Sequence, residues 1–154
     1  MARIFWKERM ARKHRAVSRY NIDMIYTSYF GNIRRIKAAF PDAVLVSVAG
    51  KTPDWFEGRA YGKLAPKYEW WREWKERFGA DPESMESMEW YIEKYSGTVL
   101  DKLDPRQTAE ELEEGAGGNP VFLLCYEAPG KFCHRHSVGL WLRRHGIECE
   151  EFMP

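Results

Sequence analysis

Two short runs of apolar residues constrain the fold of this chain more than any other feature. Residues 43–48 read Ala-Val-Leu-Val-Ser-Val and residues 120–125 read Pro-Val-Phe-Leu-Leu-Cys, so each run is apolar on both faces of an extended strand. Strands that are buried on two sides belong to a parallel sheet that helices cover above and below. The two runs therefore predict an α/β protein with a small sheet at its centre.

The remaining segments alternate around these two strands. Further strands are expected at 23–28 and 147–152, a polar loop at 49–65, and helices at 33–40, 66–78, 81–95, 104–114 and 133–144. Alternation of strands and helices favours parallel pairing with helices on both faces. We therefore predict a single Rossmann-like, three-layer α/β domain over residues 23–154, with a small, mainly parallel sheet.

Three of the expected helices have clear start signals. Asn32 is a candidate cap, while Asp81-Pro82 and Asp104-Pro105 each place a capping acid before a proline, which suits the first turn of a helix. Gly97 and Gly146 follow apolar helical patterns and are expected to end them. These signals set the expected boundaries of the helices.

Composition places the chain among globular proteins. It has 154 residues, of which 44% are hydrophobic and 31% charged. No apolar run approaches the roughly 20 residues that a membrane helix requires, so no membrane partner is expected. The N-terminus lacks the apolar stretch of a secretory signal, which favours a cytoplasmic location. Cys125, Cys133 and Cys149 are odd in number, which argues against a fully paired disulfide framework and favours thiols in a reducing compartment.

The charge of the chain is concentrated at its beginning. Residues 1–22 contain seven basic residues and a single acidic residue, Glu8, although the whole chain has a net charge of only +1. A basic arm on an acidic body can attract nucleic acid. The alternative is a solvated tail without a partner, since short basic tails are common.

The carboxyl ends of the strands define where a ligand should bind. Ligands of open α/β sheets lie beyond these ends. Polar side chains follow three of the expected strands there, and we expect them to converge: Ser28, Ser47, Lys51, Cys125, Glu127, and then Cys133, His134 and Arg135 at the start of the last helix.

The start of the last helix has the chemistry of an anion site. Free N–H groups and the helix dipole favour an anion there, and Arg135 adds a positive charge. The same environment lowers the pKa of a cysteine, so Cys133 is a candidate nucleophile, as is Cys125. Glu127 is a candidate general base. The alternative is that both cysteines are small buried apolar residues.

Several other patterns predict less. Cys125, Cys133, His134 and His136 do not have the spacing of common zinc sites, so no metal is expected. Residues 49–52 resemble the end of a phosphate-binding loop but lack its first glycine. No motif specifies a cofactor. The aromatic residues at helical spacing between 70 and 78 are more typical of a packing face than of a base-stacking platform.

A resemblance to a known family accompanies these features. The hallmark of the "domain of unknown function 488" family resembles one part of this chain, namely Leu123 to Glu127, a short turn, and residues 133–136. Weaker similarities extend over residues 23–152. The resemblance implies a Rossmann-like α/β fold, and compact members with an aromatic helical middle are of bacterial and phage type. Many members carry Asp-Val-Arg where this chain has 47–49, so Lys51 is the candidate replacement for that arginine.

Three interpretations of function follow. In the first, the chain is an enzyme or binding protein for a small anionic, nucleotide-type molecule. Arg135 and Lys51 would hold the anion, Glu127 would orient or deprotonate it, and Cys125 or Cys133 would be a nucleophile or a packing residue. In the second, the chain is an accessory protein that grips nucleic acid with residues 1–22. In the third, it is a non-catalytic interaction module.

Overall fold

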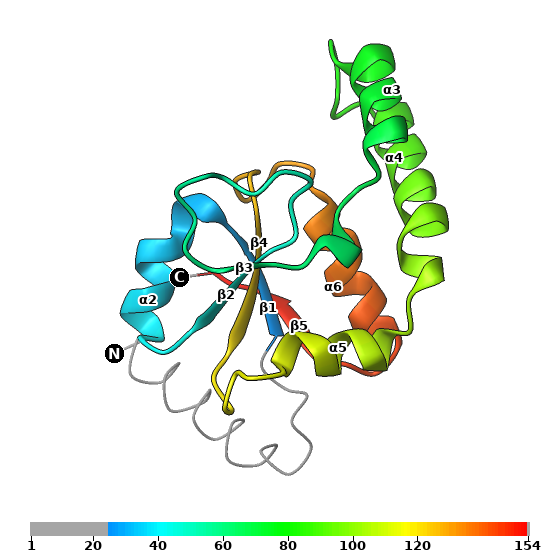
Figure 1. Ribbon diagram of the computed structural model, residues 1–154. Helices are drawn as coiled ribbons and strands as arrows, with labels where there is room; N and C mark the ends of the chain where they lie inside the picture. Colours follow the sequence, from blue (N-terminus) through cyan, green and yellow to red (C-terminus); the bar gives the residue numbers. More distant parts are fainter. Residues whose placement is uncertain (1–24, 154) are drawn as a thin grey trace.

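The computed structural model describes residues 25–153 and consists of a sheet with helices on both sides (Figure 1). The predicted basic arm, residues 1–22, lies outside the described residues. The strands are β1 (Ile25–Tyr29), β2 (Val44–Ser47), β3 (Arg59–Ala60), β4 (Val121–Cys125) and β5 (Cys149–Glu151). The helices are α2 (Ile33–Ala39), α3 (Tyr68–Phe78), α4 (Met85–Thr98), α5 (Pro105–Glu113) and α6 (His134–Arg144), with three short 3₁₀ turns between them.

The described strands form one parallel sheet in the order β3-β2-β4-β1-β5. All residues of the central strand β4 are buried, because strands flank it on two sides and helices cover both faces. This arrangement explains why the sequence of β4 is apolar without interruption. The predicted three-layer α/β fold with a small parallel sheet is confirmed.

The register of the strands decides which side chains share a face. Ser28 and Ser47 both lie opposite Leu124, whereas Cys125 lies opposite Tyr29. Successive side chains of a strand point to opposite faces. The two serines therefore belong to the face covered by α2, and Cys125 belongs to the face covered by α5 and α6 (Figure 1).

The loop predicted at 49–65 contains a strand that the sequence pattern does not reveal. Residues Arg59–Ala60 pair with the end of β2 and form the edge of the sheet. Both residues are exposed, so the apolar alternation that marks a strand is absent. The Arg59 guanidinium donates to the backbone oxygens of Glu111 and Leu112, which ties this edge to α5.

Helices α3 and α4 form a hairpin that extends away from the sheet (Figure 1). Its two arms pack through aromatic side chains, with the Tyr91 ring 4.9 Å from the Trp70 ring and 5.0 Å from the Trp74 ring. The Trp74 indole also donates to the Ser87 hydroxyl at 2.9 Å. The aromatic spacing between 70 and 78 thus serves packing, as predicted.

The boundaries of α4 differ from the prediction. The helix begins at Met85 with Ser84 as its cap, because the Ser84 hydroxyl accepts a bond from the Ser87 N–H, so the start predicted from Asp81-Pro82 is wrong. Gly97 lies inside the helix, which continues to Thr98. A glycine ends a helix only where the chain turns into the left-handed region, and Gly97 does not do so.

No helix within residues 25–153 is long and apolar enough to cross a membrane.

The cap of α5 gives a direct test of the sequence prediction. The Asp104 carboxylate accepts a bond from the Gln107 N–H at 2.8 Å, and Pro105 occupies the first turn. Replacing Asp104 with alanine should lower the free energy of unfolding by about 1 kcal/mol, because one N–H of the first turn loses its partner. Glu110→Ala, an exposed change on the same helix, should alter it by less than about 0.5 kcal/mol. Urea unfolding measures both, and equal effects would contradict the assigned cap.

Candidate functional site

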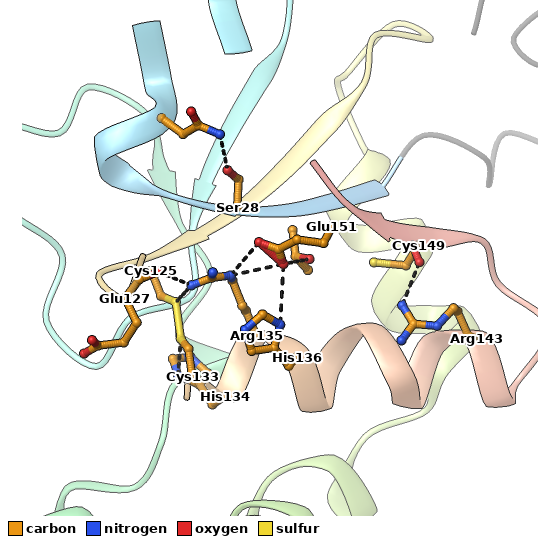
Figure 2. A network of polar contacts seen from close by, with 12 residues as sticks. Ser28, Cys125, Glu127, Cys133, His134, Arg135, His136, Arg143, Cys149 and Glu151 are labelled. Carbon is orange, nitrogen blue, oxygen red and sulfur yellow. Dashed lines mark hydrogen bonds and ion pairs between the residues drawn. A yellow bond between two sulfur atoms is a disulfide. The ribbon is translucent and has the colours of Figure 1, made fainter. Parts of the chain in front are cut away.

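The end of β4 and the start of α6 bring two cysteines together. Cys125 is the last residue of β4, Cys133 caps α6, and the turn between them folds back so that the two form a disulfide (Figure 2). Both side chains are buried. Sequence reasoning treats them as thiols, because the contact between a strand end and the following helix start is not visible in their spacing. Cys149 is the free cysteine of the described residues.

The chemistry of Cys149 differs from that of the pair. Its side chain is buried, and burial raises the pKa of the thiol to about 12. A thiol with such a pKa stays protonated near neutrality and is a poor nucleophile. Cys149 is therefore a structural residue, and it is a suitable control for experiments on Cys125 and Cys133.

His134 is the first residue of α6 and lies beside Cys133. Its Nε2 lies 2.7 Å from the Val48 carbonyl oxygen, and its Nδ1 lies 3.8 Å from Cys133 Sγ. A carbonyl oxygen can only accept, so Nε2 carries the proton and Nδ1 has a free lone pair. Burial lowers the pKa of His134 to about 4, although the bond to Val48 opposes this shift. The imidazole is thus neutral, and its Nδ1 can accept a hydrogen bond or bind a ligand.

Arg135 is fully buried and stands at the centre of the polar contacts (Figure 2). Its Nε donates to the two Glu151 carboxylate oxygens at 3.0 and 3.2 Å. Its Nη1 donates to the Glu127 backbone oxygen at 2.5 Å and approaches Cys125 Sγ at 3.2 Å. Its Nη2 is buried and has no hydrogen-bond partner among the described residues.

Glu151 is a site residue that sequence reasoning missed. Its carboxylate pairs with Arg135, accepts a bond from the Thr27 hydroxyl at 2.7 Å and lies 3.5 Å from His136 Nδ1. The alternating pattern at 147–152 predicts a strand, but it does not show which strand lies beside it. The contact arises because β5 pairs with β1 and places Glu151 opposite Thr27.

Ser28 and Ser47 lie on the opposite face of the sheet from this cluster. The Ser28 hydroxyl accepts a bond from the Asn32 side chain at 3.1 Å, and the Ser47 hydroxyl accepts one from Thr52 at 2.8 Å. Asn32 occupies the N-cap position of α2, as predicted, but its side chain is bonded to Ser28 and makes no bond to the first turn of the helix. The single set of converging side chains expected from the sequence is divided between two faces.

Aromatic side chains form the surface next to the two serines. Trp55 is 63% exposed and Tyr126 is 53% exposed, and both rings contact the buried Phe30 ring, at 6.0 and 5.0 Å between centroids. The Tyr126 hydroxyl donates to the Lys51 backbone oxygen at 2.5 Å, so the exposed Lys51 lies close to this aromatic surface. Sequence reasoning placed Tyr126 among the residues at the strand ends but did not include Trp55.

Glu127 connects the cluster to the surface. Its backbone oxygen accepts from Arg135, but its exposed side chain is directed away from the two cysteines, His134 and Arg135 (Figure 2). Burial and the negative charge of Glu127 raise the pKa of Tyr91, which shows that the carboxylate lies near α4. The predicted role of Glu127 as a general base stays a prediction.

Together, the fold and the site define a Rossmann-like α/β protein with a buried cluster of two cysteines, a histidine and an arginine at its strand ends. The model of the family described as "Active DUF488-N3 subclade" matches residues 30–146. The chain belongs to this family, as its C-terminal motif suggests. No curated protein and no solved structure matches the chain.

The low pKa of His134 predicts how stability depends on pH. The folded protein holds the pKa near 4, below the ordinary value of 6.5, so folding favours the neutral imidazole. The free energy of unfolding should therefore keep this contribution above pH 6.5 and decrease as the pH is lowered, with a loss of about 3 kcal/mol by pH 4. A histidine NMR titration should find His134 neutral, with its proton on Nε2, down to about pH 4. Titration of His134 near 6.5 would contradict this prediction.

Proposed function

We propose that the start of α6 and the neighbouring strand ends bind a small anionic, nucleotide-type molecule. The observation that carries the proposal is the buried Arg135 guanidinium, whose Nη2 has no partner among the described residues. A buried donor of this kind normally has a hydrogen-bond acceptor, because its desolvation otherwise costs about 1–3 kcal/mol. An oxygen of a phosphate or carboxylate would satisfy it.

The helix start supports the same ligand class. The cap residue Cys133 makes no side-chain bond to the first turn of α6, and its carbonyl accepts the His136 N–H at 3.1 Å, so only the N–H groups before His136 would face another acceptor. Those groups and the helix dipole favour an anion. Glu151 balances the positive charge of Arg135 through Nε but leaves Nη2 for the ligand.

The aromatic surface supports a ligand with a planar group. Trp55 and Tyr126 expose their rings at the strand ends, close to Lys51. Exposed aromatic rings bind bases by stacking, with about 1–3 kcal/mol for each base. A nucleotide would use the rings for its base and Lys51 or Arg135 for its phosphate.

The cysteines and His134 would supply chemistry after the disulfide is reduced. Cys133 Sγ lies 3.8 Å from His134 Nδ1, whose lone pair would accept a hydrogen bond from the Cys133 thiol. Cys125 lies against Arg135 Nη1, which stabilises a thiolate there. Glu127 would act as a base on the ligand from the exposed side.

Binding of AMP and inorganic phosphate to the reduced protein tests this function. We expect calorimetry to detect AMP binding, with Trp55→Ala weakening it about tenfold through loss of stacking. Lys51→Ala should weaken both AMP and phosphate through loss of charge. Trp71→Ala, which changes a partly exposed ring on α3, is the matched control and should leave both affinities unchanged. Absence of binding, or equal effects of Trp55→Ala and Trp71→Ala, would refute the proposal.

Nucleic-acid binding by residues 1–22 is the second candidate function, because seven basic residues occur there. The full chain should then bind duplex DNA with an affinity that falls steeply as salt increases, and removal of residues 1–22 should abolish that binding. Unchanged binding by the shortened chain would exclude this role. Capture of one stoichiometric protein partner, retained by the Lys51→Ala and Trp55→Ala variants, would instead support an interaction module.

A further inference from the structure

Three side chains at the start of α6 have the composition of a metal site. The Sγ atoms of Cys125 and Cys133 and a ring nitrogen of His134 all lie within 4.8 Å of one another, and all three residues are buried. Two of these residues are adjacent in the chain, so their spacing matches no common zinc pattern, and the sequence predicts no metal. The fold nevertheless brings the three ligand atoms to one point, because the turn after β4 returns the chain to its strand end.

We propose that the reduced protein binds one zinc-type divalent ion through Cys125, Cys133 and His134. The proposal rests on the corner of the molecule that carries the proposed function, and it adds a ligand that does not depend on the anion. Two thiolates and an imidazole favour zinc over the hard ions magnesium and calcium. Three protein ligands leave one position of a tetrahedral ion for water or for an oxygen of the anion, as in catalytic zinc sites.

The hydrogen bonding of His134 suits a ligand role. Its Nε2–H donates to the Val48 carbonyl at 2.7 Å, which fixes the ring and directs the Nδ1 lone pair towards Cys133. Metal-bound histidines almost always have such a bond from their second nitrogen to a carbonyl or carboxylate. The Tyr95 ring, 5.3 Å away and at 62° to the imidazole, also holds the ring orientation.

The surroundings of the cysteines suit two thiolates. Their Cα atoms lie 7.6 Å apart, wider than the usual range of a disulfide, so the two sulfurs can separate around an ion once the bond is reduced. Arg135 Nη1 donates to Cys125 Sγ at 3.2 Å and would stabilise the thiolate in the same way. Glu151 pairs with Arg135 and reduces its repulsion of a cation.

The disulfide and the ion exclude each other. A dithiol or phosphine reductant supplies two electrons, and with two protons from solvent the Cys125–Cys133 bond becomes two thiols. Binding of a divalent ion then displaces both thiol protons to solvent and leaves a neutral unit of one ion and two thiolates. The oxidised protein has no thiolate to offer, so it should not bind the ion at this site.

Titration of the full chain with Co²⁺ under an inert atmosphere tests the proposal. Phosphine-reduced protein should bind one Co²⁺ per chain, with a thiolate-to-cobalt charge-transfer band and the intense visible bands of a tetrahedral ion, and Zn²⁺ should displace it. The same protein with its disulfide intact should show neither band. This comparison uses only the wild-type sequence, so it does not depend on how a variant folds.

Variants then assign the ligands. Cys125→Ser and Cys133→Ser should lose most of the charge-transfer band, and His134→Ala should weaken Co²⁺ binding by about tenfold or more. Cys149→Ser should bind as the wild type does. Absence of the bands in the reduced wild type, or their loss in Cys149→Ser with retention in Cys125→Ser, would overturn the proposal.

The titration contains no nucleotide, so its result is separate from that of the proposed function. Cobalt binding without AMP binding would support the metal site and refute the anion site. AMP binding that depends on Trp55 and Lys51, without cobalt binding, would support the anion site and refute the metal site.

Discussion

The ion pair between the buried Arg135 and the partly exposed Glu151 is the contact on which the rest of the site depends. A guanidinium with no exposed surface is tolerated only when its charge is balanced, so loss of Glu151 would leave a buried charge without its counter-charge. The same pair joins four parts of the chain. Arg135 comes from α6 and Glu151 from β5, while Thr27 of β1 and the backbone of Glu127 after β4 bond to them. The start of α6 is therefore fixed against the sheet by charge as well as by apolar packing.

This anchoring determines where the sulfur atoms and the imidazole lie. Arg135 is held on the face of the sheet that α6 covers. The preceding residue Cys133 is thereby bonded to Cys125 at the end of β4, and His134 is bonded to the Val48 carbonyl just after β2. The chain from Cys125 to Cys133 cannot shift without breaking the bond from Arg135 to the Glu127 carbonyl. The disulfide uses this arrangement, and the proposed metal site would use it after the two cysteines are reduced.

The sequence predicts the scaffold of this site better than its contacts. The apolar run of β4, the Asp104-Pro105 start of α5 and the extent of α6 follow from local chemistry, so burial pattern and capping suffice to predict them. Glu151 does not follow, because its role depends on β5 lying beside β1. The exposed strand at Arg59–Ala60 does not follow either, because it depends on pairing with β2. The Asn32 side chain could bond either to the first turn of α2 or to Ser28, and the sequence does not show which bond forms.

The division of the predicted residues between two faces follows from the pleat of the sheet. Ser28 and Ser47 share a row and turn towards α2, while Cys125, one residue beyond that row on the central strand, turns towards α6. The Ser28 hydroxyl accepts a bond from Asn32 and the Ser47 hydroxyl accepts one from Thr52. The two serines therefore stabilise the loops that carry the aromatic surface. Tyr126 follows Cys125 directly and belongs to that surface. A ligand at the end of β4 would thus lie beside Cys125 of the buried cluster on one face and beside the exposed Tyr126 ring on the other. The end of the central strand thus places the buried cluster and the exposed rings on adjacent residues, although the two lie on opposite faces of the sheet.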